Sequence, residues 1–173
     1  MALLDGKVAI VTGASSGIGR ATALMFAAHG AALVLTARRG ALLEELASTI
    51  RHDGGEVELV VGDITQAQTH ERLVAVALNR FGGLDIAVNN AGIIGPLKPL
   101  VAISPEEWQH TLQTNLTAAF LGARSQIPAN AHAWQRFTDF HLQLCRHQRG
   151  PSWHGGLRGF KSRTHGIGKR HYG

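Results

Sequence analysis

The sequence predicts an α/β fold in which helices cover both faces of a doubly wound parallel sheet. Over the first 130 residues, four short apolar runs alternate with stretches of helical periodicity. A glycine-rich turn joins the first apolar run directly to the first helical stretch. Strands that alternate with helices of this length are joined by right-handed crossovers, so the strands run parallel and both faces of the sheet are buried.

Each predicted element follows from an apolar run and a start or stop signal. Gly30 is a natural C-cap for the first helix. The last helix begins at Ser104-Pro105-Glu106-Glu107, where serine can cap the helix, proline fits the first position and the acids complement the dipole. The predicted strands are 7–12, 32–36, 57–61 and 85–89, and the predicted helices are 17–29, 41–51, 66–80 and 105–127. We expect the strand order 3-2-1-4, with the sheet truncated after its fourth strand.

The turn Thr-Gly-Ala-Ser-Ser-Gly-Ile-Gly after the first strand is typical of phosphate binding. A buried strand that ends in glycines and opens a helix presents backbone N–H groups and a helix dipole to an anion, which predicts a dinucleotide pyrophosphate as the ligand. Gly13 permits the tight turn, Gly17 lets the backbone approach the phosphates, and Gly19 lets the helix pack closely on the strand. Ser15 and Ser16 add hydroxyl donors.

This turn resembles the T-G-x-x-x-G-x-G fingerprint of the short-chain dehydrogenase/reductase family, which has a Rossmann-type fold. A glycine triplet alone is a weak signal, because flexible turns share it. Three further stretches match family motifs in order and approximate spacing: Gly62-Asp63-Ile64, Asn89-Asn90-Ala91-Gly92 and Asn115. The resemblance covers Leu4 to about Ala129. It implies an oxidoreductase that transfers a hydride between a nicotinamide cofactor and a small-molecule carbonyl or alcohol substrate.

The resemblance also implies roles for individual residues. In relatives, an aspartate at the position of Asp63 accepts a hydrogen bond from the adenine amino group, and the backbone N–H at the position of Ile64 lies next to it. The alternative is an ordinary turn residue, because aspartate is common after a strand. Asn115 is the one catalytic residue that the resemblance places, and its family role is to hold a water in a proton relay. Asn89 is expected to stabilise the sheet. The other expected cofactor-binding residues are Gly13, Ser15, Ser16, Gly17, Ile18, Gly19, Asn90, Ala91 and Gly92.

The end of the second strand indicates which nicotinamide cofactor binds. An acidic residue there would bond the ribose hydroxyls and repel a 2′-phosphate, but this chain has Ala37-Arg38-Arg39. Arg38, with or without Arg39, is suited to pair with a phosphate bidentately. The alternative is a solvated pair of surface arginines. The sequence therefore favours NADP over NAD.

Composition divides the chain into an NAD(P)-binding domain at 1–129 and a non-family tail at 130–173. The first segment carries nine Lys and Arg against eleven Asp and Glu, whereas the second carries eight against one. The second segment also holds six of the ten histidines and two of the three tryptophans. It shows no sustained helical or alternating pattern, so we expect a disordered or irregular basic tail.

Several partner classes are excluded or disfavoured. No long apolar run and no signal-peptide pattern occurs, so we expect no membrane partner. The single cysteine, Cys145, cannot form an internal disulfide. Together these observations predict a cytoplasmic protein. His141, Cys145 and His147 fall short of the four ligands of a closed zinc site, so no metal is expected. Arginines and aromatic residues of the tail suit nucleic acid, which is the less favoured partner. The resemblance implies a homo-oligomer that uses the last helix.

The family's catalytic serine and its Y-x-x-x-K pair do not occur in this sequence, whose single tyrosine is Tyr172. The tail can be back-translated with all synonymous codons and then read one base later. In that frame, residues 130–146 permit Met-Leu-Thr-Arg-Gly-Ser-Gly-Ser-Leu-Ile-Phe-Thr-Ser-Ser-Phe-Val-Gly, which resembles the family's fifth strand and its catalytic serine. Residues 153–163 permit Gly-Met-Ala-Ala-Tyr-Ala-Ala-Ser-Lys-Ala-Gly, with tyrosine and lysine at the family spacing. Both tail tryptophans, which have a single codon, fall where the shifted frame must read glycine.

We therefore interpret the tail as frame-shifted after about Ala129, which leaves the chain without the family's catalytic centre. Two other functions stay open at this point. One is a non-catalytic nucleotide-binding remnant, and the other is a protein whose basic tail binds nucleic acid.

Overall fold

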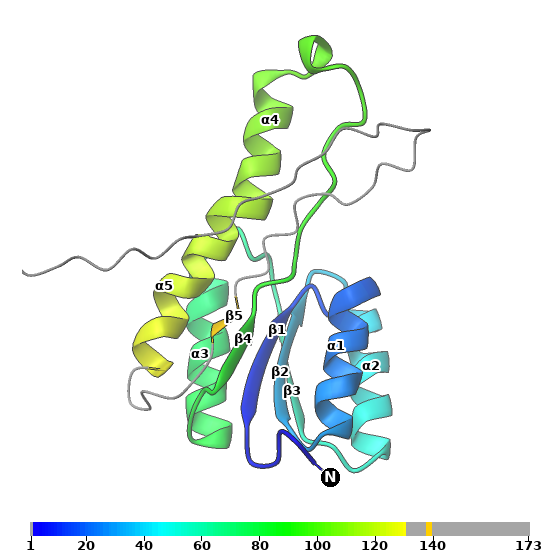
Figure 1. Cartoon of the computed structure of the whole chain (residues 1–173), viewed down its shortest axis with the longest axis vertical. Coiled ribbons are helices and arrows are strands. Elements are labelled where there is room, and N and C mark those ends of the chain that lie inside the picture. The colour runs from blue at the N-terminus through cyan, green and yellow to red at the C-terminus, as the bar shows by residue number, and fades with distance from the viewer. Residues whose placement is uncertain (1, 131–137, 140–173) are drawn as a thin grey trace, which may run out of the picture.

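The computed structural model describes residues 2–130 and 138–139, and it contains a parallel sheet with helices on both faces (Figure 1). The strands are β1 (Val8–Thr12), β2 (Ala32–Ala37), β3 (Val57–Val61), β4 (Ile86–Val88) and β5 (Thr138–Asp139). The helices are α1 (Gly17–Ala28), α2 (Gly40–His52), α3 (Ala67–Phe81), α4 (Pro105–Leu112) and α5 (Ala118–Asn130), with a short 3-10 helix η1 (Leu100–Ala102) and a π-helical turn η2 (Gln113–Thr117).

The sheet has the order β3-β2-β1-β4-β5 and all its strands are parallel. The predicted order 3-2-1-4 is confirmed. The expected truncation after the fourth strand is corrected, because β5 continues the sheet by pairing with Ala87 and Val88 of β4. Because the strands are parallel, their carboxyl ends lie at one edge of the sheet. The turns that follow β1, β2, β3 and β4 therefore meet there.

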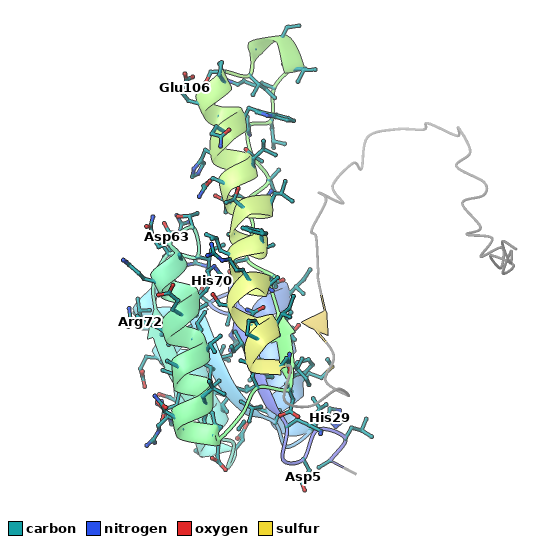
Figure 2. All side chains as sticks on the ribbon, turned by 90° about the vertical axis from the view of Figure 1, so that its left-hand side faces the viewer. Asp5, His29, Asp63, His70, Arg72 and Glu106 are labelled. Carbon is teal, nitrogen blue, oxygen red and sulfur yellow. The ribbon has the colours of Figure 1, made fainter. Side chains whose placement is uncertain are left out.

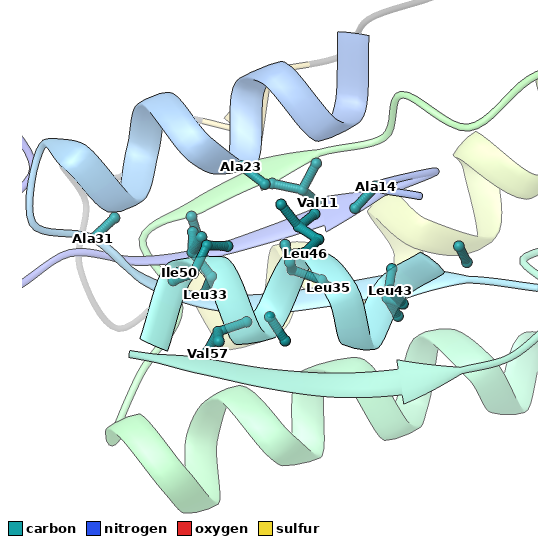
Figure 3. Packing of buried hydrophobic residues seen from close by; sticks show 13 residues of the cluster. Val11, Ala14, Ala23, Ala31, Leu33, Leu35, Leu43, Leu46, Ile50 and Val57 are labelled. Carbon is teal, nitrogen blue, oxygen red and sulfur yellow. The ribbon is translucent and has the colours of Figure 1, made fainter. Parts of the chain in front are cut away.

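The core has two layers, one on each face of the sheet. Side chains that alternate along the strands point to opposite faces, so Val11 packs toward α1 and α2 while Ile10 packs toward α3. Burial on both faces explains why the strands read as continuous apolar runs. Figure 3 shows the layer beneath α1 and α2, which includes Val11, Leu33, Leu35, Leu43, Leu46, Ile50 and Val57.

The predicted helix 105–127 is observed as α4, η2 and α5 in one continuous rod, whose upper part extends beyond the sheet (Figure 1). Its start is the predicted one. The Ser104 hydroxyl accepts from the Glu107 N–H at 3.3 Å, and the Ser104 N–H donates to the Glu107 carboxylate at 2.8 Å. The expected end before Pro128 is corrected, because α5 continues through this proline to Asn130. Pro128 has no N–H to donate, so the last turn of α5 lacks one helical hydrogen bond.

None of the helices in the described part of the chain combines the length and the apolar character needed to cross a lipid bilayer.

Candidate functional site

A cavity of about 530 Å³ opens at the carboxyl edge of the sheet, where the β1 and β4 crossovers diverge to opposite faces. Such a topological switch point is where doubly wound sheets bind their ligands. The cavity is lined by Gly13, Ser15, Ser16, Gly17, Ile18, Ala37, Arg38, Arg39, Gly62, Asp63, Ile64, Thr65, Asn90, Ala91, Gly92, Ile93, His110, Gln113 and Thr114. All the predicted site residues are among them except Gly19 and Asn115.

The glycine-rich turn after β1 leaves room for a ligand on its outer side. Gly13 and Gly17 have φ angles of +68° and +55°, which side chains rarely adopt. A Cβ on Gly17 would meet no atom within 4 Å, so its backbone faces open space. Ser16, the N-cap of α1, makes no side-chain cap bond, and the first turn holds no acidic residue. The positive end of α1 is thus accessible to an anion.

Gly19 lies behind this turn rather than in the cavity. A Cβ there would collide with the Gly13 carbonyl oxygen and would lie 2.6 Å from Asn90 Nδ2. Asn90 Nδ2 itself donates to the Thr12 carbonyl at 3.0 Å. The missing side chain of Gly19 therefore lets α1 approach the turns after β1 and β4.

Two arginines follow β2, and they have different surroundings. Arg39 Nη2 donates to the hydroxyl oxygens of Ser15 at 3.0 Å and Ser16 at 2.8 Å. Because a guanidinium only donates, both serine oxygens accept here and their hydroxyl hydrogens stay available for another acceptor. Arg38 also lines the cavity, and its charge helps to lower the pKa of Asp63. Positive charge therefore borders the cavity at the end of β2.

Asp63 lies after β3, near the start of α3 (Figure 2). Its Oδ1 accepts from the backbone N–H and from the hydroxyl of Thr65, both at 2.9 Å. The hydrogen bond from the Thr65 N–H is the main cause that lowers the pKa of Asp63. Burial raises this pKa, whereas the Thr65 hydroxyl and the charges of Arg38 and His110 lower it further. Asp63 is therefore a turn residue that also presents an ionised acceptor at the cavity.

The turn after β4 is tied to β1 by short hydrogen bonds. The Ala91 N–H donates to the Thr12 hydroxyl at 3.0 Å, next to the bond from Asn90 to the Thr12 carbonyl. A Cβ on Gly13 would lie only 2.9 Å from the Ala91 Cα. These contacts set the width of the cavity between the two turns.

Asn89 stabilises the packing of the sheet against α5, in line with the expectation from the sequence. Its amide forms two buried hydrogen bonds with the amide of Gln126, at 2.8 and 3.1 Å. A Cβ on Gly122 would lie 2.5 Å from Asn89 Oδ1, so a glycine is needed for this approach. Sequence reasoning missed Gln126, whose only signal is an amide on the buried face of a helix.

Asn115 lies in the π-helical turn η2 and does not line the cavity. Its Oδ1 accepts from the Ile93 N–H and its Nδ2 donates to the Ile93 carbonyl, both at 2.8 Å. The side chain thus joins the helix to the chain that follows β4. Its expected role in a proton relay stays a prediction.

Three cavity residues come from the long helix and were missed. His110, Gln113 and Thr114 are spaced i, i+3 and i+4, which places them on one face of the helix. That spacing is a signal that the sequence could have provided.

The remaining candidates of the sequence lie outside the described residues. They are His141, Cys145, His147 and Tyr172. Within residues 2–130 and 138–139, no cluster of three His, Cys, Asp or Glu side chains could hold a metal ion.

Known proteins resemble this chain over its first three quarters. The family model described as short chain dehydrogenase matches residues 7–133. An uncharacterized oxidoreductase of Listeria monocytogenes is 40% identical over 126 residues, which are 73% of this chain and 50% of that protein. A 3beta-hydroxysteroid dehydrogenase of Mediterraneibacter gnavus is 33% identical over 127 residues, or 73% of this chain and 46% of the relative. The chain thus spans about half the length of these relatives.

Solved structures agree with this likeness. A metagenomic short-chain oxidoreductase in complex with NADP superimposes with a TM-score of 0.73 at 36% identity, covering 78% of this chain and 61% of the other. A citronellol catabolism dehydrogenase of Pseudomonas aeruginosa gives a TM-score of 0.67 at 42% identity, covering 73% of this chain and 52% of the other.

Proposed function

Because the chain belongs to the short-chain dehydrogenase family, we propose that its cavity binds NADP(H) for the interconversion of a carbonyl and an alcohol. The observation that carries the proposal is the cavity itself. It joins an open glycine turn, an uncapped helix start and a pair of arginines at the switch point of the sheet. A phosphate-bearing dinucleotide matches that combination of charge and shape.

The residues fit such a cofactor in two places. At the pyrophosphate, the open side of Gly17 and the N–H groups at the start of α1 would face the phosphates, and Ser15 and Ser16 have hydroxyl hydrogens to donate. At the adenine, the ionised carboxylate of Asp63 would accept from the amino group, beside the backbone of Ile64. Ala91 and Gly92 would line the path between the two.

Arg38 and Arg39 support NADP over NAD. No carboxylate stands at the end of β2 to bond the ribose hydroxyls, and Arg38 lies at the cavity without a serine partner of the kind that Arg39 has. We therefore assign the 2′-phosphate to Arg38, with Arg39 holding the serines of the glycine turn. The NADP complex of the metagenomic relative is consistent with this choice.

For the reaction, the nicotinamide supplies or accepts the hydride. The contribution of the described residues is to bind and orient. Asn115 would fix the helix against Ile93, which lines the cavity, through its two bonds of 2.8 Å. We keep Asn115 as the candidate catalytic residue, with the role of holding a water in the proton relay that the family resemblance implies.

We further propose that this chain lacks the proton donor of the reaction. Its sequence has no Y-x-x-x-K, and loss of general acid catalysis alone costs about 10²–10⁴ in rate. Thr138–Asp139 pair with β4, where a fifth parallel strand continues the sheet, and the shifted frame permits Leu-Ile at these two positions. A nucleotide sequence of codons 125–163 whose shifted frame contains a stop would contradict the frame-shifted interpretation.

The long helix supports a homo-oligomer, the family expectation. Trp108, Leu116, Phe120 and Ile127 are each more than half exposed in the described part of the chain. Sedimentation of the full chain should show a species larger than a monomer, and a monomer at all concentrations would contradict this assignment.

The cofactor proposal is tested with two ligands that differ only in the 2′-phosphate, 2′,5′-ADP and 5′-AMP. The unmodified chain should prefer 2′,5′-ADP, and Arg38→Ala should remove that preference while leaving 5′-AMP binding unchanged. Arg124→Ala, an exposed arginine outside the cavity, is the matched control and should behave like the unmodified chain. Equal binding of both ligands by the unmodified chain would contradict the assignment of Arg38.

A further inference from the structure

A buried histidine lies directly behind the proposed adenine end of the cavity. His70, in the first turn of α3, is 1% exposed and lies close to Asp63 in the view of Figure 2. Its ring borders a small void that is also lined by Asn89 and by Ala118 of α5. None of the roles described above uses this side chain.

One ring nitrogen of His70 has a short hydrogen bond and the other has none. Nε2 lies 2.7 Å from the Ile64 carbonyl oxygen, and because a carbonyl only accepts, Nε2 carries the proton. Nδ1 is buried without a hydrogen-bond partner among the described residues. Burying an unpaired nitrogen costs free energy, and an apolar side chain at this position would avoid that cost. What a histidine adds here is therefore its bond to the Ile64 carbonyl. Burial also lowers the pKa of His70, which keeps the ring neutral.

The bond from His70 acts on the peptide that shapes the carboxylate of Asp63. The Ile64 carbonyl and the Thr65 N–H belong to one planar peptide unit. The carbonyl side of this unit accepts from His70, and the N–H side donates to Asp63 Oδ1 at 2.9 Å. His70 therefore fixes one end of a rigid unit whose other end orients Asp63.

We propose that His70 is a positioning residue for adenine: through the Ile64–Thr65 peptide it holds the Asp63 carboxylate where the adenine amino group binds. This inference rests on the proposed function, because it takes the cavity to be an adenine nucleotide site. It predicts that His70 affects recognition of the amino group and leaves the phosphate and ribose contacts unchanged.

The test compares 5′-AMP with 5′-IMP, which lacks the adenine amino group, on the full chain. His70→Leu removes the donor and fills a similar volume, whereas His70→Gln offers an amide N–H at a similar reach. His70→Met, a more flexible apolar replacement, is measured alongside. The unmodified chain should prefer 5′-AMP. His70→Leu and His70→Met should weaken 5′-AMP binding roughly three- to tenfold, with 5′-IMP binding within a factor of two, and His70→Gln should restore most of the loss.

Thermal unfolding of the same variants separates positioning from a structural role. His70→Leu removes an unpaired buried nitrogen but also leaves the Ile64 carbonyl without its donor, and these effects oppose each other, so its unfolding temperature should stay close to that of the unmodified chain. Equal weakening of 5′-AMP and 5′-IMP, or no weakening of either, would overturn the assignment of His70. If the unmodified chain binds 5′-AMP no better than 5′-IMP, the role of Asp63 and with it this inference are overturned, and failure to bind either nucleotide would overturn the proposed function itself.

Discussion

Replacing Gly19 with alanine would place a methyl group where α1 meets the turns after β1 and β4. The new Cβ would collide with the Gly13 carbonyl and lie 2.6 Å from Asn90 Nδ2. Gly13 directly follows Thr12, the last residue of β1, so the turn can move away from the new Cβ only by disturbing the end of the strand. Overpacking of this kind costs about 1–3 kcal/mol, and displacing Asn90 from the Thr12 carbonyl adds about 0.5–1.5 kcal/mol.

Alanine also favours the helix over glycine by up to about 1 kcal/mol, which offsets part of that cost. We therefore expect Gly19→Ala to lower the free energy of unfolding by about 0.5–3.5 kcal/mol, measured by urea denaturation followed by circular dichroism. The same variant should bind dinucleotide more weakly, because the turn that faces the phosphates is displaced.

Gly40→Ala is the matched control for Gly19→Ala. Gly40 also lies in the first turn of a helix, but a Cβ there would lie 3.3 Å from Cγ2 of Val61, which is a side-chain atom and not backbone. This variant should gain the helix propensity of alanine without a backbone collision. If Gly19→Ala were as stable as Gly40→Ala and bound dinucleotide normally, the close approach of α1 to the turns would not be a requirement of the fold.

Three further predictions concern charge, a buried amide pair and pH. Arg38→Asp should reverse the preference from NADPH to NADH in binding titrations, whereas Arg124→Asp should not. Gln126→Leu should lower the free energy of unfolding in urea by about 1–3 kcal/mol, because it leaves the Asn89 amide buried and unpaired. The double variant with Asn89→Leu should lose less free energy than the sum of the losses of the two single variants. Burial lowers the pKa of His70 below its unfolded value, so the folded state binds fewer protons and the free energy of unfolding should fall as the pH drops from about 7 to 5. His70→Leu should make the free energy of unfolding depend less steeply on pH in this range. An unchanged slope would contradict the lowered pKa of His70 as its cause.

The elements of the fold could be predicted because their causes are local. Strands buried on both faces, such as β1 and β2, must be apolar throughout, and the glycines of the turn mark where the backbone needs a positive φ. The start of α4 was predictable from Ser104 and its capping box. The cavity followed from topology, since parallel strands bring their carboxyl ends to one edge.

The remaining features depend on contacts between distant parts of the chain. Gln126 bonds Asn89 across 37 positions, and Asn115 bonds the backbone of Ile93, so neither partner is readable from local pattern. The end of α5 beyond Pro128 was not predicted, because a proline with no N–H to donate is a local signal for the end of a helix. The role of His70 was equally hidden, because a histidine in a helix looks the same in sequence whether it faces solvent or a peptide.

A titration of the unmodified full chain with NADPH, and separately with NADH, decides whether the cavity is a dinucleotide site that selects for the 2′-phosphate. A charge-assisted pair with Arg38 should make NADPH bind about tenfold or more tightly than NADH, with one molecule bound per chain. Failure to bind either dinucleotide would contradict the cofactor site, and equal affinities would contradict its preference for NADP.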